Sequence, residues 1–188
     1  MTDDVPAPGL LDPRRSVLLV VDLQEKLVPA IPDGETVIDR TGRLIDAAHR
    51  LDVPVLASEQ YPRGLGVTVQ PLRDRLGPGV CVEKDTFDAL RAPEVVRRLA
   101  ASRRDQVVLA GTEAHVCVLQ TAFGCRARGY GTFVVADAVG SRAPTSREHA
   151  LTRLRAGGAG VVTMEMVIFE WLERAGTDAF RAVMPLVR

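Results

Sequence analysis

Short, continuously apolar runs alternate with longer amphipathic segments along most of this chain. The first run, Ser16-Val-Leu-Leu-Val-Val-Asp22, has apolar side chains at successive positions, which is typical of a strand buried on both faces of a parallel sheet. The next segment, residues 36–51, repeats its apolar side chains at helical spacing, with arginine and aspartate elsewhere. The chain is therefore predicted to begin with a strand and an amphipathic helix.

The same alternation continues through residue 175. It predicts further strands at 53–57, 80–83, 106–111, 132–136 and 160–163, and helices at 92–102, 116–129, 146–156 and 164–175, with a loop at 62–66. The strand 132–136 is expected to stop at Asp137, and Ser146 to cap the helix 146–156. Strands that alternate with helices predict an α/β fold: a three-layer sandwich with a six-stranded, mostly parallel, doubly wound (Rossmann-like) sheet and helices on both faces.

The length of 188 residues favours one domain, because two domains would each lie near the lower end of the usual size range. We expect residues 1–188 to form it, with residues 1–13 as a flexible N-terminal extension. The first eight residues lack the basic and then apolar order of a signal peptide. No apolar run approaches the roughly 20 residues that cross a bilayer. These features predict a cytoplasmic protein without a membrane partner.

Charge is balanced, with 24 Lys+Arg against 24 Asp+Glu. A protein that neutralises several phosphates usually has a basic excess, so no nucleic-acid partner is expected. Of the 24 basic residues, only Lys26 and Lys84 are lysine. Because this chain uses arginine for nearly all its positive charge, each lysine raises the question of what arginine could not do at that position.

The three cysteines, Cys81, Cys117 and Cys125, show no C-x-x-C spacing, so neither a disulfide framework nor a thiolate metal site is suggested. The three histidines are far apart and form no metal-binding pattern. The sequence therefore predicts no bound metal and no cofactor.

Three reactive side chains fall at the carboxyl ends of predicted strands. Asp22 closes the first strand, Lys84 follows the third, and Cys117 lies just beyond the fourth at a predicted helix N-terminus. Ligands of doubly wound sheets bind beyond the carboxyl ends of the strands, so these residues are expected to meet at one rim.

Each of the three also has an ordinary structural explanation. A strand-end aspartate often caps the next helix, a lone cysteine is usually a small buried apolar residue, and a lone lysine is usually a solvated charge. Cys81 and Cys125 fit the structural interpretation. The coincidence of three such residues at one rim favours chemistry.

The chemistry that these residues permit is coherent. A helix N-terminus and a nearby ammonium are expected to lower the pKa of the Cys117 thiol and favour thiolate. Asp22 is placed to accept the thiol proton and later deliver it to a leaving group. Two backbone N–H groups in the turn before Cys117 would bind an oxyanion, an effect of about 3 kcal/mol per donor in other enzymes.

Five motifs then occur in register between residues 14 and 174. They are Val-Val-Asp22-Leu-Gln24, Ser58-Glu-Gln-Tyr-Pro-Arg-Gly-Leu-Gly66, Glu83-Lys84-Asp-Thr-Phe87, Gly111-Thr-Glu-Ala-His-Val-Cys117-Val and Asp137-Ala-Val-Gly-Ser-Arg142. Together they resemble the isochorismatase-like cysteine hydrolase family, and within it the isochorismatase-domain hydrolases rather than the nicotinamidases.

The resemblance implies roles for individual residues. The Asp–Lys–Cys triad of the family falls on Asp22, Lys84 and Cys117. A cis peptide between Thr112 and Glu113 is implied, which would direct the N–H groups of Glu113 and Cys117 at the substrate oxygen. The family fold is the six-stranded sheet predicted above, and its members are commonly dimers or larger assemblies, so a homo-oligomer is expected.

Two departures from related enzymes narrow the assignment. Nicotinamidases hold a metal through an Asp-x-His-Pro segment, whereas Tyr61 replaces that histidine here, which argues against a catalytic metal and against nicotinamide. True isochorismatases lack the cysteine. The residues expected to line the substrate pocket are Gln24, Leu27, Gln60, Tyr61 and Phe87, and for the last four loop packing is the alternative.

The resulting interpretation is a cysteine hydrolase that cleaves a C–N bond of a small amide, or an ester, through a thioester. Two alternatives remain at this point: a non-catalytic small-molecule-binding or scaffold protein with the same fold, and a redox-sensing thiol. The segment 177–188 is expected to dock on a neighbour such as another subunit. Ser141 and Arg142 are left open between a structural role and a subunit contact.

Overall fold

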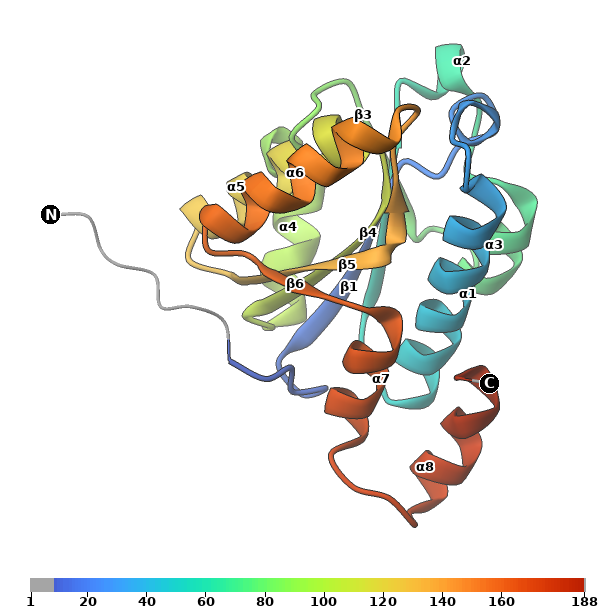
Figure 1. The fold of residues 1–188 in the computed structure, drawn as a ribbon, viewed down its shortest axis with the longest axis vertical. Coiled ribbons are helices and arrows are strands. Elements are labelled where there is room, and N and C mark those ends of the chain that lie inside the picture. Colours follow the sequence, from blue (N-terminus) through green and yellow to red (C-terminus); the bar gives the residue numbers. More distant parts are fainter. Residues whose placement is uncertain (1–8, 188) are drawn as a thin grey trace, which may run out of the picture.

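The structure, a computed structural model, describes residues 9–187 and contains one six-stranded sheet (Figure 1). The strand order is β3-β2-β1-β4-β5-β6, and every neighbouring pair is parallel. This doubly wound order confirms the predicted fold class. The strands are β1 Ser16–Val21, β2 Val55–Gln60, β3 Cys81–Lys84, β4 Gln106–Thr112, β5 Gly131–Gly140 and β6 Gly160–Val162.

Helices cover both faces of the sheet. The α-helices are α1 Gly34–Arg50, α2 Pro62–Leu65, α3 Gln70–Leu76, α4 Pro93–Ser102, α5 Leu119–Ala127, α6 Pro144–Ala156, α7 Met164–Leu172 and α8 Asp178–Val183. Shorter turns are η1 Val28–Ala30, η2 Ala89–Arg91, η4 Met184–Leu186 and the π-helical turn η3 Ala114–Val118. Helices α1, α3, α7 and α8 pack on one face, and α4, α5 and α6 on the other (Figure 1).

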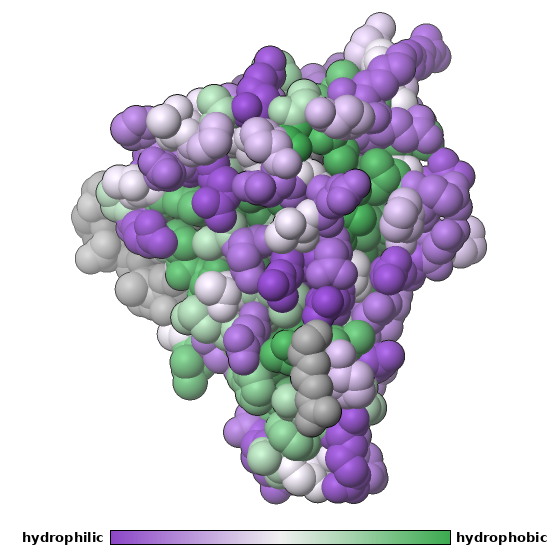
Figure 2. All heavy atoms as spheres, turned by 45° about the vertical axis from the view of Figure 1, so that its right-hand side comes forward, coloured by the Kyte–Doolittle hydropathy of each residue, from purple (hydrophilic) through white to green (hydrophobic). Residues whose placement is uncertain are grey.

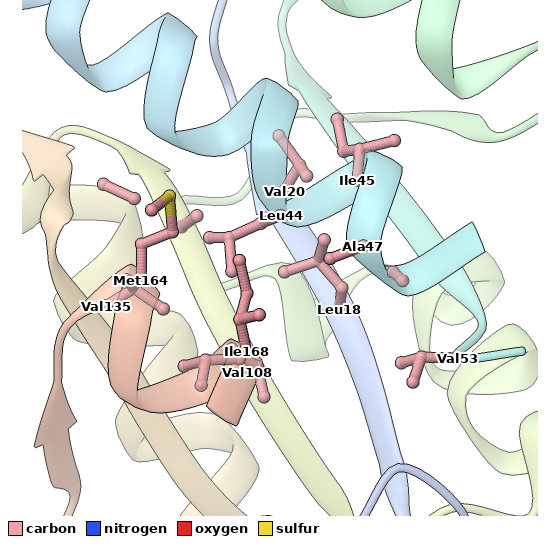
Figure 3. Close-up of a cluster of buried hydrophobic side chains, with 14 of the residues drawn as sticks. Leu18, Val20, Leu44, Ile45, Ala47, Val53, Val108, Val135, Met164 and Ile168 are labelled. Carbon is pink, nitrogen blue, oxygen red and sulfur yellow. The ribbon is translucent and has the colours of Figure 1, made fainter. Parts of the chain in front are cut away.

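The core consists of two apolar layers separated by the sheet. Leu18 and Val20 of β1 point toward α1 and α7 (Figure 3), whereas Val17 and Leu19 point toward the opposite helices. All six residues of β1 are buried, which explains why the strand is apolar at successive positions. Burial of each large aliphatic side chain contributes about 1.5–3 kcal/mol.

The structure corrects the extent of β5. The strand does not stop at Asp137 but continues to Gly140 after an irregularity opposite Leu109 to Gly111 of β4. The Asp137 carboxylate accepts a hydrogen bond from the backbone of Met164 at 2.7 Å and so holds the start of α7. The longer strand delivers residues 141 and 142 to the carboxyl end of β4.

Several other boundaries also differ from the sequence prediction. The second strand lies later than 53–57 and includes Gln60, whose partner in the register is Lys84. The expected loop 62–66 contains the short helix α2, and α3 was not predicted. Helix α6 begins at Pro144 rather than at Ser146, because a proline fits the first helical turn, where its missing N–H is not needed.

The C-terminal segment packs on its own chain. Val183 of α8 is fully buried, and the carbonyl of Ala182 accepts a hydrogen bond from Arg50 of α1 at 3.0 Å. The prediction that this segment docks on a neighbour was therefore wrong for the buried face of α8. In the view of Figure 2 hydrophilic side chains cover most of the surface, and hydrophobic ones show between them in several places.

The first eight residues of the predicted extension 1–13 lie outside the described residues. The rest of the extension is attached to the domain. Leu11 is buried, and its N–H donates to the Glu170 carboxylate at 2.7 Å. The N–H of Asp12 donates to the Gln106 side chain. Within residues 9–187, no helix combines the length and the apolarity that crossing a bilayer requires.

One buried hydroxyl offers a test of this core. Thr41 of α1 is fully buried, and its Oγ1 has no hydrogen-bond partner. We expect Thr41→Val to raise the free energy of unfolding by about 1 kcal/mol, because it replaces an unsatisfied polar atom with a methyl group of similar size. Thr132→Val is the matched control and should lower it by about 1 kcal/mol, since the Thr132 hydroxyl donates to the Tyr130 carbonyl at 3.0 Å. Urea unfolding measures both, and a destabilised Thr41→Val protein would contradict the expectation.

Candidate active site

The carboxyl ends of four adjacent strands bring Asp22, Lys84 and Cys117 to one rim. Asp22 follows β1 directly, Lys84 is the last residue of β3, and Cys117 lies in η3 after β4. Because all these strands are parallel, their carboxyl ends lie at the same edge. The structure therefore places the three predicted residues together.

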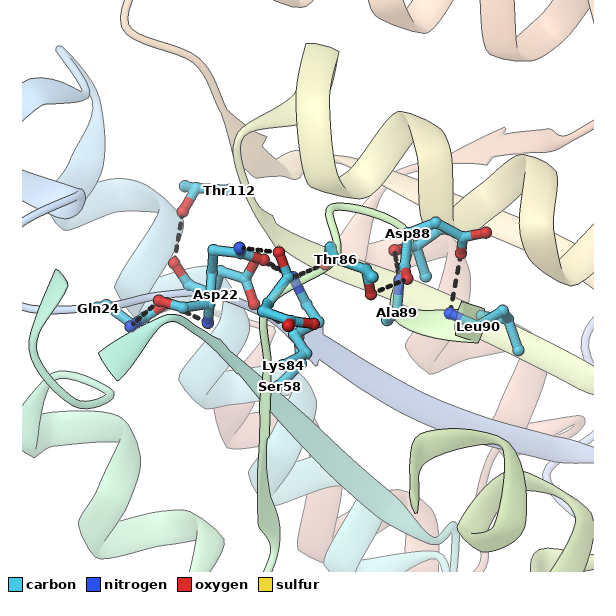
Figure 4. Close-up of polar contacts among 12 residues, drawn as sticks. Asp22, Gln24, Ser58, Lys84, Thr86, Asp88, Ala89, Leu90 and Thr112 are labelled. Atoms are coloured by element: carbon cyan, nitrogen blue, oxygen red, sulfur yellow. Dashed lines mark hydrogen bonds and ion pairs between the residues drawn. The ribbon is translucent and has the colours of Figure 1, made fainter. Parts of the chain in front are cut away.

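Asp22 and Lys84 form an ion pair whose side chains are 0% exposed. Lys84 Nζ donates to Asp22 Oδ2 at 2.7 Å, to Gln60 Oε1 at 2.7 Å and to the carbonyl of Thr86 at 3.2 Å (Figure 4). The three donors of the ammonium thus have three acceptors. A planar guanidinium does not match three acceptors around one nitrogen, which gives a physical reason for lysine here.

Ser58 fixes the other oxygen of Asp22. Its Oγ donates to Asp22 Oδ1 at 2.7 Å, and both residues are buried. The carbonyl of Asp22 accepts from Thr112 Oγ1 at 2.8 Å, which ties the end of β1 to the end of β4. Sequence reasoning gave Ser58 no role, although it begins one of the five motifs. Its position in β2 beside β1 was the missing information.

Gly111 allows the ends of β1 and β4 to approach this closely. Its φ is +125°, and a Cβ atom there would lie 2.0 Å from the carbonyl oxygen of Val21. Only glycine fits both constraints. The peptide bond between Thr112 and Glu113 is cis, as the resemblance implies.

Cys117 is buried, with 5% of the residue exposed, and its thiol interacts electrostatically with the Asp22 carboxylate. The thiol pKa is raised to about 12: burial is the largest cause, the negative charge of Asp22 acts in the same direction, and Lys84 opposes both. The expected lowering of this pKa was therefore wrong. The reason is that Lys84 is already paired with Asp22, so the thiol faces a nearly neutral ion pair from inside a desolvated site.

The pKa of Asp22 is also raised. Burial raises its pKa above the ordinary value for aspartate, against the opposing influence of Lys84 and of hydrogen bonds from Lys84, Ser58 and Cys117. A carboxylate with raised proton affinity is a better base toward a thiol. The site therefore keeps the thiol protonated beside a carboxyl group of increased proton affinity.

The turn that carries Cys117 is held from β5. Arg142 Nε and Nη2 donate to the two oxygens of Glu113 at 2.9 and 2.7 Å. Ser141 Oγ lies 2.9 Å from Nδ1 of His115. The sequence left Ser141 and Arg142 undecided, and the motif 137–142 was the available signal. The structure assigns their side chains to contacts within the chain.

The predicted pocket residues fall into two groups. Gln24 is fully buried, and its side chain binds the backbone of Gln60 and Gly66. The Gln60 amide donates to the carbonyl of Asp85 and accepts from Lys84. Both glutamines therefore stabilise the strand ends, and their contact with a substrate stays a prediction.

Three pocket candidates remain accessible. Tyr61 and Phe87 are 58% and 52% exposed, and Leu27 is half-buried. The Tyr61 N–H donates to the Lys84 carbonyl at 2.8 Å, which places the backbone of Tyr61 at the rim of the site. Their contact with a substrate stays a prediction.

The other cysteines lie elsewhere. Cys125 is fully buried and Cys81 is half-buried beside Thr68. Burial is the main reason that the pKa of each thiol is raised. In the part of the chain that the structure describes, no group of three or more His, Cys, Asp or Glu side chains is arranged to hold a metal ion.

Comparisons with known proteins agree with this architecture. Residues 16–166 match the isochorismatase domain family. The secreted isochorismatase effector Isc1 of Phytophthora sojae is 38% identical over 184 residues, which cover 96% of this chain and 88% of that protein.

Two solved structures are similar over most of their length. The structure described as MAR1 ribonuclease from Caenorhabditis elegans has a TM-score of 0.90 and 37% identity, covering 95% of this chain and 92% of that chain. The YcaC protein of Escherichia coli, described as an octameric hydrolase of unknown specificity, has a TM-score of 0.88 and 24% identity, covering 94% and 88%. At that identity, the second likeness concerns the fold alone.

The buried ion pair predicts an asymmetric response to mutation. Lys84→Met should lower the free energy of unfolding by about 3 kcal/mol, because it leaves Asp22 buried without its counter-charge. The double variant Asp22→Asn/Lys84→Met should recover most of that loss. Lys26→Met is the matched control: Lys26 is exposed, and we expect a change within about 0.5 kcal/mol. Urea unfolding of the three variants checks this, and equal effects at both lysines would contradict it.

Proposed function

The chain belongs to the isochorismatase family and has its hydrolase fold, and we propose on that premise that it cleaves a small amide, or an ester, through a thioester on Cys117. The observation that carries this proposal is the contact of one buried carboxylate, Asp22, with both the Lys84 ammonium and the Cys117 thiol. That arrangement joins a nucleophile, its base and a compensating charge.

The proposed reaction begins with proton transfer. Asp22 takes the proton of the Cys117 thiol while Sγ attacks the substrate carbonyl carbon. The carbonyl π electrons move to oxygen, and the N–H groups of Glu113 and Cys117 stabilise the resulting oxyanion. When the tetrahedral intermediate collapses, the C–N bond breaks and Asp22 returns the proton to the leaving nitrogen. A thioester on Cys117 and a free amine or ammonia result.

Water completes the cycle. Asp22, again a carboxylate, removes a proton from a water molecule whose oxygen attacks the thioester carbonyl. Collapse of the second tetrahedral intermediate breaks the C–S bond, releases the carboxylic acid and returns the proton to sulfur. Lys84 stabilises Asp22 whenever it is a carboxylate, that is, before it takes each proton and after it has returned it. Atoms and charge balance over the two halves.

The exposed aromatic side chains at the rim suit a substrate with a small, planar or apolar acyl group. Tyr61 and Phe87 are among the most exposed large hydrophobic side chains of the described residues. The Tyr61 N–H donates to the Lys84 carbonyl, and Phe87 follows Lys84 by three residues. We propose that these rings and Leu27 contact the substrate beside the thiol. Stacking on aromatic rings suits a flat acyl group.

The alternatives gain less support from the site. A scaffold or binding protein has no evident use for a buried Asp–Lys pair, because desolvation makes such a pair costly to keep. A similar structure is described as a ribonuclease, but a buried thiol beside a carboxylate suits attack on an acyl carbon better than cleavage of a polymer. A redox role has less support, because all three cysteines are free and Cys81 and Cys125 belong to other elements, β3 and α5.

We also propose that the chain forms a homo-oligomer, since the similar YcaC protein is described as octameric; light scattering measures this. A cytoplasmic location stays a prediction, because one relative is described as a secreted effector.

The function is tested by activity profiling of the pure protein against a panel of primary amides, with ammonia as the readout. For any amide that is cleaved, Cys117→Ala should lower kcat at least about 10³-fold, since no other group replaces the nucleophile. Cys81→Ala serves as the control and should retain wild-type kcat. Circular dichroism confirms that each variant is folded.

A second readout identifies the intermediate. Mass spectrometry of acid-quenched reactions should find an acyl adduct on Cys117 and none on Cys81 or Cys125. Wild-type turnover in Cys117→Ala would end the proposal, as would cleavage of RNA by the pure protein without cleavage of any amide or ester.

A further inference from the structure

The end of β5 reaches the turn between β4 and α5 through two consecutive residues. After the irregularity near Asp137, β5 resumes pairing with β4, and Gly140 lies opposite Thr112. Ser141 and Arg142 follow directly, so they stand beside the residues that lead to Cys117. The chemistry proposed above gives no role to either of them.

Arg142 makes the more extensive contact. Its backbone N–H donates to Glu113 Oε1 at 3.1 Å, in addition to the two guanidinium hydrogen bonds at 2.9 and 2.7 Å. The Glu113 side chain is 7% exposed, whereas that of Arg142 is 66% exposed. The hydrogen bonds from Arg142 lower the pKa of Glu113, so this carboxylate is charged at neutral pH. A bidentate pair of this kind fixes orientation as well as distance.

Glu113 passes this restraint to the nucleophile. Its carbonyl oxygen accepts hydrogen bonds from the N–H groups of Val116 at 3.0 Å and Val118 at 3.2 Å. These two residues flank Cys117. The carboxylate of Glu113 is thus held by Arg142, while its carbonyl holds the π-helical turn that carries the thiol.

A second contact supports the same turn. Ser141 is buried, and its Oγ lies 2.9 Å from His115 Nδ1. The turn is therefore restrained on both sides of Ala114, at Glu113 and at His115. Both restraints originate from one rigid strand end.

From these contacts we propose that Arg142 is a positioning residue: it holds Glu113 so that the amide of Glu113 and the turn carrying Cys117 keep the geometry that binds the oxyanion. This inference rests on the proposed function. A displacement of about 1 Å in such a group lowers the rate about 10²-fold in other enzymes, so a restraint outside the reacting atoms has a measurable effect.

The kinetic test compares Arg142→Gln and Arg142→Lys with a control at another bidentate pair. Arg142→Gln should lower kcat about 10- to 100-fold with little change in KM. Arg142→Lys should be intermediate, because lysine keeps the charge but loses the planar fork. The control is Arg97→Gln on α4, whose guanidinium binds Glu94 at 2.8 and 2.6 Å on the surface; its kcat should equal that of the wild type.

Alkylation of Cys117 by iodoacetamide separates positioning from thiol activation. This reaction displaces iodide and forms no oxyanion, so its rate in Arg142→Gln should stay within about twofold of the wild type. A parallel fall of kcat and alkylation rate would overturn the proposed action on the oxyanion site. An unchanged kcat would overturn the positioning role altogether.

Hydrogen exchange tests the restraint without any substrate. The amides of residues 113–118 should exchange at least about tenfold faster in Arg142→Gln than in the wild type, and Arg97→Gln should leave them unchanged. Unchanged exchange in Arg142→Gln would overturn the restraint even in an active hydrolase. Faster exchange in a protein that hydrolyses nothing would support the restraint and reject the proposed function, so the two failures are distinguishable.

Discussion

The arrangement of the site depends on one fully buried ion pair, Asp22 with Lys84. Removing two charges from water costs several kcal/mol per ion, and the loss is offset only where every remaining donor and acceptor is satisfied. Ser58, Gln60 and Thr86 supply those partners. Because each of them comes from the end of β2 or β3, the pair is stable only when the sheet has its observed order.

The same ion pair determines the state of the nucleophile. A lone ammonium beside Cys117 would favour thiolate, but Lys84 is neutralised by Asp22, and burial then keeps the thiol protonated. In the reaction proposed above, proton transfer to Asp22 therefore accompanies the attack on carbon. In the proposed reaction, the sulfur gains a bond to the carbonyl carbon as it loses its proton.

The sequence predicted the ends of strands best where every residue of the strand is buried. Fully buried parallel strands such as β1 and β4 are apolar at most positions, so their ends, and with them Asp22 and Cys117, were predictable, whereas β3, which ends at Lys84, is only partly buried. The length of β5 was not predictable, because Asp137 resembles a strand end and the irregular residues hide the later pairing with Thr112. The structural roles of Gln24 and Gln60 depend on which backbone atoms lie next to them in space, and the thiol pKa depends on competing effects of burial and charge.

The fold uses two different cations, Lys84 and Arg142, to bind carboxylates near the proposed site, and the two differ in their exposure to solvent. At the reacting centre the cation must be compact and dry, and the chain uses one of its two lysines, fully buried. At the edge of the turn the cation has only to hold an orientation, and the fork of Arg142 does this while its side chain stays largely in water. Because the Arg142 side chain is largely exposed, holding Glu113 in this way avoids the desolvation of a second cation. The extension of β5 past its irregularity is what makes this division possible, since a strand that stopped at Asp137 would leave Glu113 a buried carboxylate without a counter-charge.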